Sequence, residues 1–246
     1  MIVIDNIGLI GDFLGSIPVI IELAKRNPNN LSVYFNQSMH DIVEMIPKKY
    51  NINILSEEPS SYDYKLDISA AFQYAAIHKL HMTQTYFHQC KLETPPGPVK
   101  PELEVMEFDI YTSNIDYILA PFSRSLPNNQ RWPKENWTHL TNAMPDKNFL
   151  LLGNSNHDDI NFIQTPNTKT MFDRPLNEVA YIMKNSKAKL LSVVTGISHL
   201  SYALDVPTIL FWNQGEIKNW GDNPDAKHLT KYIPDITIQE IILALK

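Results

Sequence analysis

The chain has 246 residues, of which 43% are hydrophobic and 20% charged, and a formal net charge of -6. This composition excludes a disordered or collagen-like chain, and the length allows one large domain or two small ones. The acidic balance gives no overall positive field for a polyanion. Nucleic acid is therefore an unfavoured partner unless a local basic groove holds it.

The chain has a single cysteine, Cys90, so an internal disulfide is excluded, and no group of Cys and His residues has zinc-ligand spacing. The apolar N-terminal stretch contains Asp5 and Asp12, which excludes a signal peptide and a membrane span. These features predict a cytoplasmic protein without a metal, and they leave open a peripheral place at the inner membrane face.

Strands and helices alternate in the first half of the chain. Strands are expected over 2–4, 31–35 and 52–55, and helices over 13–26, 41–46 and 69–90. Four prolines between residues 94 and 101 exclude a helix or a central strand there, so this segment is the expected linker.

The same alternation restarts after the proline-rich segment. Strands are expected over 117–120, 149–152, 190–194 and 208–212, and helices over 135–143, 177–185 and 236–245. This order predicts a second α/β lobe.

The first motif lies where the first strand ends. Gly8, Gly11 and Gly15 surround Asp12, and the helix is expected to begin near Ser16. The glycines either let backbone approach a ligand or merely allow a tight turn in which Asp12 caps the helix. Their spacing is not that of a dinucleotide-binding loop, so a nicotinamide cofactor is not expected.

The second motif consists of residues 119–125 and 130–137. A strand leads into a polar loop with Arg124 and Arg131, and Pro133 then opens a helix. Backbone N–H groups and positive charge converge there, which suits a diphosphate. The alternative is that the two tryptophans of this motif pack the lobe while both arginines are solvated.

The third motif spans residues 192–212. A strand ends at Thr195 and Gly196, and Ser198 and His199 enter the first turn of the following helix. The N–H groups of such a turn suit phosphate or sugar hydroxyls.

Together the three motifs resemble those of the heptosyltransferases, the ADP-heptose:lipopolysaccharide family, from Ile2 to about Gly221. The resemblance implies an α/β fold with two Rossmann-like lobes facing a cleft, the glycosyltransferase-B architecture. Residues 1–112 would be the acceptor lobe with the catalytic base, and residues 113–246 would bind the nucleotide-sugar donor.

The resemblance also implies roles for individual residues. Asp12 corresponds to the catalytic base, and Gly11 and Gly15 belong to the loop on the acceptor side. Asp158 stands where a carboxylate reaches the donor ribose, and Arg174 lies near the position that contacts the nucleotide base. The donor-binding set is Ser123, Arg124, Gln130, Arg131, Asp158, Arg174, Thr195, Gly196, Ser198 and His199.

Some positions depart from the family pattern. Gln130 replaces a phosphate-contacting lysine, Val194 replaces an acid, and residues 213–221 differ in chemistry from the usual turn. Histidines at 78, 81 and 88 fall on the expected helix of the first lobe and are interpreted as surface or acceptor-side residues.

The resemblance implies an inverting, metal-independent transfer of heptose or a related sugar from a nucleotide-sugar to a hydroxyl of a glycan or glycoconjugate. An ADP-sugar is favoured as co-substrate, with no further cofactor. The alternatives are a non-catalytic scaffold that binds nucleotide-sugars, which the changes at Gln130 and Val194 raise, and an epimerase or hydrolase acting on a nucleotide-sugar.

Overall fold

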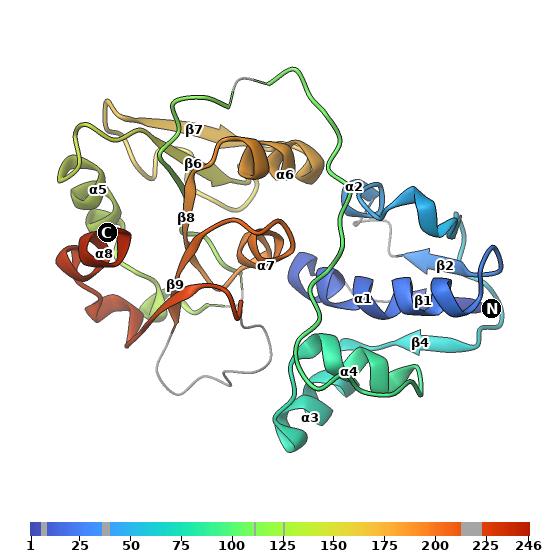
Figure 1. Ribbon diagram of the computed structural model, residues 1–246. Helices are drawn as coiled ribbons and strands as arrows, with labels where there is room; N and C mark the ends of the chain where they lie inside the picture. The colour runs from blue at the N-terminus through green and yellow to red at the C-terminus, as the bar shows by residue number, and fades with distance from the viewer. Residues whose placement is uncertain (6–8, 36–39, 111, 125, 213–222) are drawn as a thin grey trace. The chain divides into compact units, whose positions relative to one another are not determined.

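The computed structural model describes residues 1–5, 9–35, 40–110, 112–124, 126–212 and 223–246 (Figure 1). These residues form two compact units, one of residues 1–106 with 223–224 and one of residues 107–212 with 225–246. The chain first passes from one unit to the other after Met106, whereas the predicted boundary follows residue 112. Each unit contains a parallel β-sheet of its own.

The first unit has a four-stranded parallel sheet in the order β3-β2-β1-β4. Its elements are β1 (Ile2–Asp5), α1 (Ile10–Arg26), β2 (Ser32–Phe35), α2 (His40–Val43), a 3-10 turn (Lys48–Tyr50), β3 (Asn53–Leu55), β4 (Tyr64–Leu66), α3 (Ile68–His78) and α4 (Met82–Gln89). Since β2 and β3 lie on one side of β1 and β4 on the other, the chain changes direction across the sheet between β1 and β4.

Helix α1 begins at Ile10, earlier than the predicted start near Ser16. Proline is favoured in a first helical turn, but Pro18 lies in the interior of α1. Most of the residues of α1 are buried, so packing on nearly all sides stabilises the helix despite this residue. Phe13 packs edge-on against Phe35 of β2, with ring centroids 5.1 Å apart, and burying such a side chain contributes about 1.5–3 kcal/mol.

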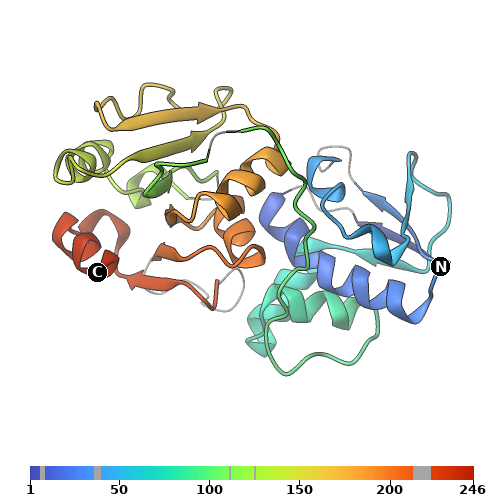
Figure 2. The ribbon, with the colours of Figure 1, turned by 45° about the horizontal axis from the view of Figure 1, so that its top comes forward.

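The single helix predicted over 69–90 is wrong, because the chain forms two helices there. Helix α3 stops at Lys79, which has a left-handed φ of 55°, and His81 then caps α4. The His81 N–H donates to the Gln84 side chain at 2.9 Å, and the Thr83 N–H donates to His81 Nδ1 at 3.2 Å. Helices α3 and α4 lie side by side (Figures 1 and 2).

The proline-rich segment 94–101 is not the linker, because it belongs to the first unit. The Gln84 side chain donates to the Pro95 carbonyl at 2.8 Å, and the Val99 N–H donates to Thr83 Oγ1 at 3.0 Å. Since both partners lie on α4, the segment is fixed along that helix.

The second unit has a six-stranded parallel sheet in the order β10-β9-β8-β5-β6-β7. Its elements are β5 (Tyr117–Ala120), a 3-10 turn (Asn128–Gln130), α5 (Lys134–Asn142), β6 (Phe149–Gly153), β7 (Thr168–Phe172), α6 (Leu176–Asn185), β8 (Lys189–Val193), α7 (Gly196–Ala203), β9 (Thr208–Trp212), β10 (Lys227–Thr230), a 3-10 turn (Ile233–Asp235) and α8 (Ile238–Leu245).

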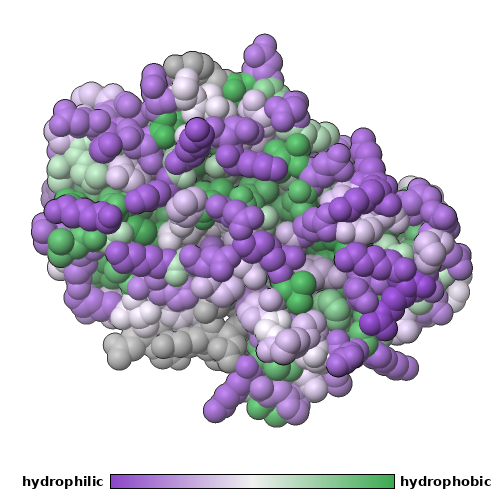
Figure 3. Space-filling model, viewed as in Figure 1, coloured by the Kyte–Doolittle hydropathy of each residue, from purple (hydrophilic) through white to green (hydrophobic). Residues whose placement is uncertain are grey.

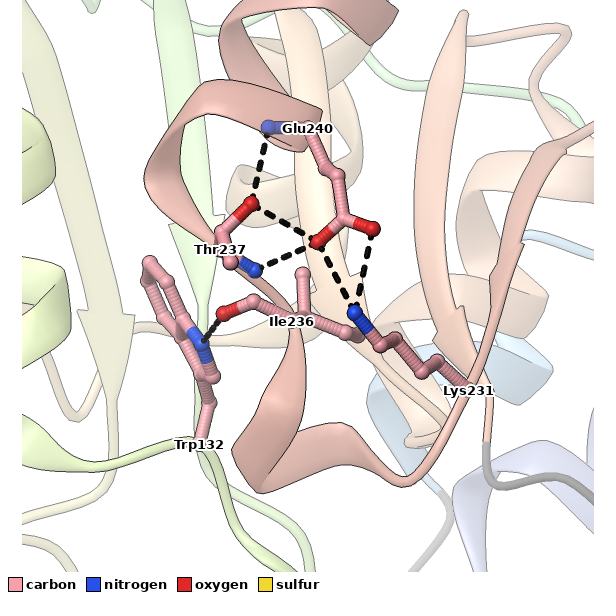
Figure 4. A network of polar contacts seen from close by, with 5 residues as sticks. All are labelled: Trp132, Lys231, Ile236, Thr237 and Glu240. Atoms are coloured by element: carbon pink, nitrogen blue, oxygen red, sulfur yellow. Dashed lines mark hydrogen bonds and ion pairs between the residues drawn. The ribbon is translucent and has the colours of Figure 1, made fainter.

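Aromatic side chains form the centre of the core of the second unit. Trp132 meets Trp137 edge to face with centroids 4.9 Å apart, and Trp137 stacks on Phe211 of β9 at 5.3 Å. The Trp132 indole N–H also donates to the Ile236 carbonyl at 2.7 Å (Figure 4). This bond connects the start of α5 to the segment that leads into α8.

None of the described helices is long and apolar enough to cross a bilayer. On the face drawn in Figure 3, hydrophilic residues are widely spread and hydrophobic residues appear among them in smaller areas. Single exposed apolar side chains are ordinary for folded proteins.

Candidate functional site

Asp12 lies in the first turn of α1, and its side chain is buried, with 8% of the residue exposed. The N-cap of α1 is Leu9, so the alternative in which Asp12 caps the helix is wrong. Helix α1 follows β1, at the position where the sheet of the first unit changes direction. A carboxylate in a first turn is favoured by the positive end of the helix dipole.

Gly11 and Gly15 lie within α1 and are buried, so their predicted place in a loop is wrong. A Cβ atom on Gly15 would lie 2.7 Å from Met82 Sδ and 3.3 Å from Tyr86 Cε2. The missing side chain thus lets α4 approach α1 closely. Gly8 lies outside the described residues.

The histidines of this unit have structural contacts. His81, predicted at the surface or on the acceptor side, is 4% exposed and caps α4. Tyr74 of α3 lies between His78 and His88, at centroid distances of 4.1 and 3.9 Å. In the parts of the chain that the structure describes, no group of three or more His, Cys, Asp or Glu residues could hold a metal ion.

In the second unit, all strands are parallel and their carboxyl ends meet at one edge of the sheet. The order β10-β9-β8-β5-β6-β7 changes direction between β5 and β8. Ligands of open α/β sheets bind at such a point, outside the carboxyl ends of the strands. The segments that follow β5 and β8 contain Ser123, Arg124 and residues 195–199, so the topology brings two of the predicted donor-binding segments together.

The loop after β5 is held by Arg131. Its Nη2 donates to the Ser123 carbonyl at 2.9 Å, and its Nε donates to the Leu126 carbonyl at 3.1 Å. The alternative of a solvated Arg131 is therefore wrong, whereas Arg124 is exposed as that alternative expects. Ser123 is buried, and Gln130 is half-buried at the end of the 3-10 turn.

The start of α7 is fixed by Thr195 and Ser198. The Thr195 N–H donates to Ser198 Oγ at 3.1 Å, and the Ser198 hydroxyl donates to the Thr195 carbonyl at 2.7 Å. With 1% of Ser198 exposed, its hydroxyl contributes to the turn itself. Gly196 and His199 are half-buried in the first turn of α7, and the Ser198 and His199 N–H groups donate to the Thr195 carbonyl at 3.0 and 3.4 Å.

Hydrogen-bonded hydroxyl groups of β9 and α7 stabilise this turn. Thr208 Oγ1 of β9 donates to Ser201 Oγ at 2.9 Å, and the Ser201 hydroxyl donates to the Ser198 carbonyl at 2.7 Å. Both hydroxyls are buried. These bonds fix α7 against β9 and so hold the Thr195 turn at the end of β8.

Two more predicted donor residues follow β6 and β7 and have local partners. Asp158 accepts from the Asn154 N–H at 2.8 Å, and Arg174 forms an ion pair with Glu178 at 3.3 Å. A further acidic residue, Asp173, was not predicted, and its carboxylate accepts from the Ser155 N–H at 2.8 Å. The bonds from Ser155 lower the pKa of Asp173. Asp173 follows β7, a strand that was not predicted, and no pattern in the sequence indicates this contact.

Residues 62–231 match the model of glycosyltransferase family 9 (heptosyltransferase). The chain belongs to this family. The match includes every predicted donor-binding residue, whereas Gly11, Asp12 and Gly15 precede it. Sugar transfer is the activity of the family, so the protein is a glycosyltransferase, and the resemblance stated from the three motifs is confirmed. No curated protein sequence matches the chain.

Solved heptosyltransferases share the fold of this family 9 chain. ADP-heptose lps heptosyltransferase II of E. coli has a TM-score of 0.72 and 14% identity, over 99% of this chain and 98% of that one. A family 9 glycosyl transferase of Veillonella parvula DSM 2008 has a TM-score of 0.70 and 13% identity, over 99% and 95%. E. coli heptosyltransferase WaaC with ADP has a TM-score of 0.70 and 12% identity, over 99% and 98%. The predicted α/β glycosyltransferase-B fold is thus confirmed.

Proposed function

We propose that this family 9 protein is an inverting, metal-independent glycosyltransferase that moves heptose or a related sugar from a nucleotide-sugar to a hydroxyl of a glycan or glycoconjugate. The observation that carries the proposal is the change of direction between β5 and β8, where Ser123, Arg124 and the Thr195 turn share one edge of the sheet. We also propose a cytoplasmic location, which allows a peripheral association with the inner membrane face.

The donor diphosphate would lie at the start of α7. The N–H groups of Gly196 and Ile197 and the positive end of the helix dipole favour an anion there. The exposed guanidinium of Arg124 adds a charge suited to a phosphate, and Arg131 acts by fixing the loop. Of the remaining predicted contacts, His199 and Gln130 would face the donor, Asp158 the ribose and Arg174 the nucleotide base.

An ADP-sugar is the favoured donor. Solved family members were obtained with ADP, in E. coli WaaC, and with ADP-D-beta-D-heptose, in the iron-containing heptosyltransferase TibC. TibC has a TM-score of 0.67 and 14% identity, over 92% of this chain and 61% of that one.

In the proposed reaction Asp12 accepts the proton of the acceptor hydroxyl. The freed oxygen bonds to the anomeric carbon while the bond from that carbon to the diphosphate oxygen breaks, and the nucleoside diphosphate leaves with the electron pair. One displacement with one base inverts the anomeric carbon. The Thr195 turn and Arg124 would stabilise the charge that develops on the leaving diphosphate.

The test begins with melting temperatures of the purified protein in a panel of nucleoside diphosphates and nucleotide-sugars. We expect ADP and ADP-sugars to raise the melting temperature most, because a ligand of the native state stabilises it by mass action. The nucleotide-sugar found in this way is then incubated with saccharide acceptors after treatment with a chelator. Proton NMR of the product should show the inverted anomeric configuration.

The changes at Gln130 and Val194 favour a second candidate, a scaffold that binds a nucleotide-sugar without turnover. Val194 is half-buried directly before the Thr195 turn and has no charge to offer a donor. A raised melting temperature without transfer to any acceptor would support the scaffold. An altered free nucleotide-sugar in the absence of acceptor would instead support an epimerase or hydrolase.

A further inference from the structure

Helix α4 lies against the face of α1 that contains the proposed base. Asp12 and Gly15 are three residues apart and share one face of α1. The space that a Cβ on Gly15 would need is occupied by Met82 and by the Tyr86 ring, 3.3 Å away at Cε2. Tyr86 therefore contacts α1 one helical turn from Asp12.

The hydroxyl of Tyr86 is buried in an unusual way. The residue is 0% exposed, and its Oη has no hydrogen-bond partner among the described residues. A buried hydroxyl without a partner costs about 1–3 kcal/mol, so most buried tyrosine hydroxyls form a hydrogen bond. A phenylalanine would fill the same space without this cost.

Three carboxylates contribute negative charge to the surroundings of this hydroxyl. Burial raises the pKa of Tyr86 well above its ordinary value, and the negative charge of Asp12 raises it further, followed by Asp5 and Asp67. The hydroxyl thus stays protonated at neutral pH and can act as a donor. Asp5, at the end of β1, accepts from the Ser16 hydroxyl, and Asp67 caps α3 through the Ala70 N–H at 2.9 Å.

The other titratable side chains on or beside α4 are Cys90, His81 and His88. Burial, with a smaller contribution from Asp5, raises the pKa of the Cys90 thiol to about 12, so it is neutral. His81 Nδ1 lies 2.9 Å from Thr83 Oγ1, and His88 stacks on Tyr74 of α3. Tyr86 is thus the tyrosine that α4 packs against α1, with a buried hydroxyl that has no hydrogen-bond partner among the described residues.

We propose that Tyr86 is a positioning residue for the Asp12 base, to which its hydroxyl donates a hydrogen bond when the acceptor is bound. The inference rests on the proposed function, because it needs Asp12 to act as the base. Catalytic hydrogen bonds are often long in the absence of substrate and shorten in the complex. The bond orients the carboxylate and stabilises its ionised form.

The test compares Tyr86→Phe with the wild type over a range of pH. The variant keeps the ring, so its melting temperature should stay the same or rise. We expect kcat to fall about tenfold and the acid limb of kcat/KM to move up by about one pH unit, because ionised Asp12 has lost a donor. Tyr117→Phe removes the hydroxyl of another buried tyrosine, on β5, and should leave the kinetics unchanged.

The other possible results distinguish a failure of this inference from a failure of the proposed function. A Tyr86→Phe protein with the wild-type acid limb and kcat would overturn the inference, and so would one that fails to fold, since the hydroxyl would then be structural. Asp12→Asn is measured in parallel. If the wild type transfers no sugar, or Asp12→Asn transfers it at the wild-type rate, the proposed function itself has failed.

Discussion

Gly15 is the residue at which helix packing depends most directly on the absence of a side chain. We expect Gly15→Ala to lower the free energy of unfolding by about 1–3 kcal/mol, because the new Cβ would lie 2.7 Å from Met82 Sδ and within 3.3 Å of the Tyr86 ring. Urea unfolding measures the change. Gly97→Ala is the matched control, since a Cβ there would have no neighbour within 4 Å. Equal stabilities for the two variants would show that α4 adjusts freely.

The sequence shows which residues are unusual, but it shows less reliably what each of them does in the structure. The glycines near Asp12 are predicted to lie in a loop, because a missing side chain lets the backbone approach a ligand. In the structure the missing side chain of Gly15 instead lets a second helix approach α1. Tyr86 gives no signal at all, since an aromatic residue in a helical pattern predicts only burial. The environment of its hydroxyl depends on three acidic residues that are distant in the chain.

At the scale of elements, α8 begins with a capping box whose charge can be titrated. Glu240 accepts from the Thr237 N–H at 2.7 Å and lies 3.2 Å from Lys231 Nζ (Figure 4). The Thr237 backbone, the Thr237 hydroxyl and then Lys231 lower the pKa of Glu240 to about 2. Because the folded pKa lies below the ordinary value, the ionised side chain stabilises the fold above that value, and this contribution is lost as pH falls toward 2.

Glu240→Gln tests this contribution. At neutral pH we expect a loss of about 0.5 kcal/mol, the low end for a cap because the side chain is exposed. The difference from the wild type should shrink between about pH 5 and about pH 3 in urea unfolding. Glu135→Gln, an exposed acid in the first turn of α5, is the control. A difference that is independent of pH would mean that charge is not the cause.

The central strands could be predicted, whereas of the four edge strands only β3 was expected, over 52–55. The predicted ranges of β5 and β9 match the structure, because strands buried on both faces are continuous apolar runs. β7 and β10 lie at the two edges of their sheet, and their sequences, Thr168–Phe172 and Lys227–Thr230, are mostly polar. β4 has only three residues, which is too short for a period to be visible.

At the scale of the whole molecule, the site was predicted as three segments, and only the sheet order explains how two of them meet. No spacing in the sequence states that β5 and β8 are neighbours, since β6, β7 and two helices lie between them in the chain. The motif after β8 was nevertheless recognised, because its residues form a self-contained turn closed by Ser198. Asp158 and Arg174 follow other strands, and each contacts a residue four positions away in the chain. Their roles in donor binding are therefore proposals.

Because the proposed base lies in one compact unit and the proposed donor site in the other, binding and transfer should be separable by substitution. Asp12→Asn should retain the rise in melting temperature with ADP and lose sugar transfer by about 100-fold or more. His199→Ala should weaken the ADP effect, which for the wild type corresponds to about 2.7 kcal/mol when ADP is at 100 times its Kd. His139→Ala, an exposed histidine on α5, is the control. Loss of the ADP effect in Asp12→Asn would contradict this division, and an undiminished effect in His199→Ala would remove the start of α7 from the donor site.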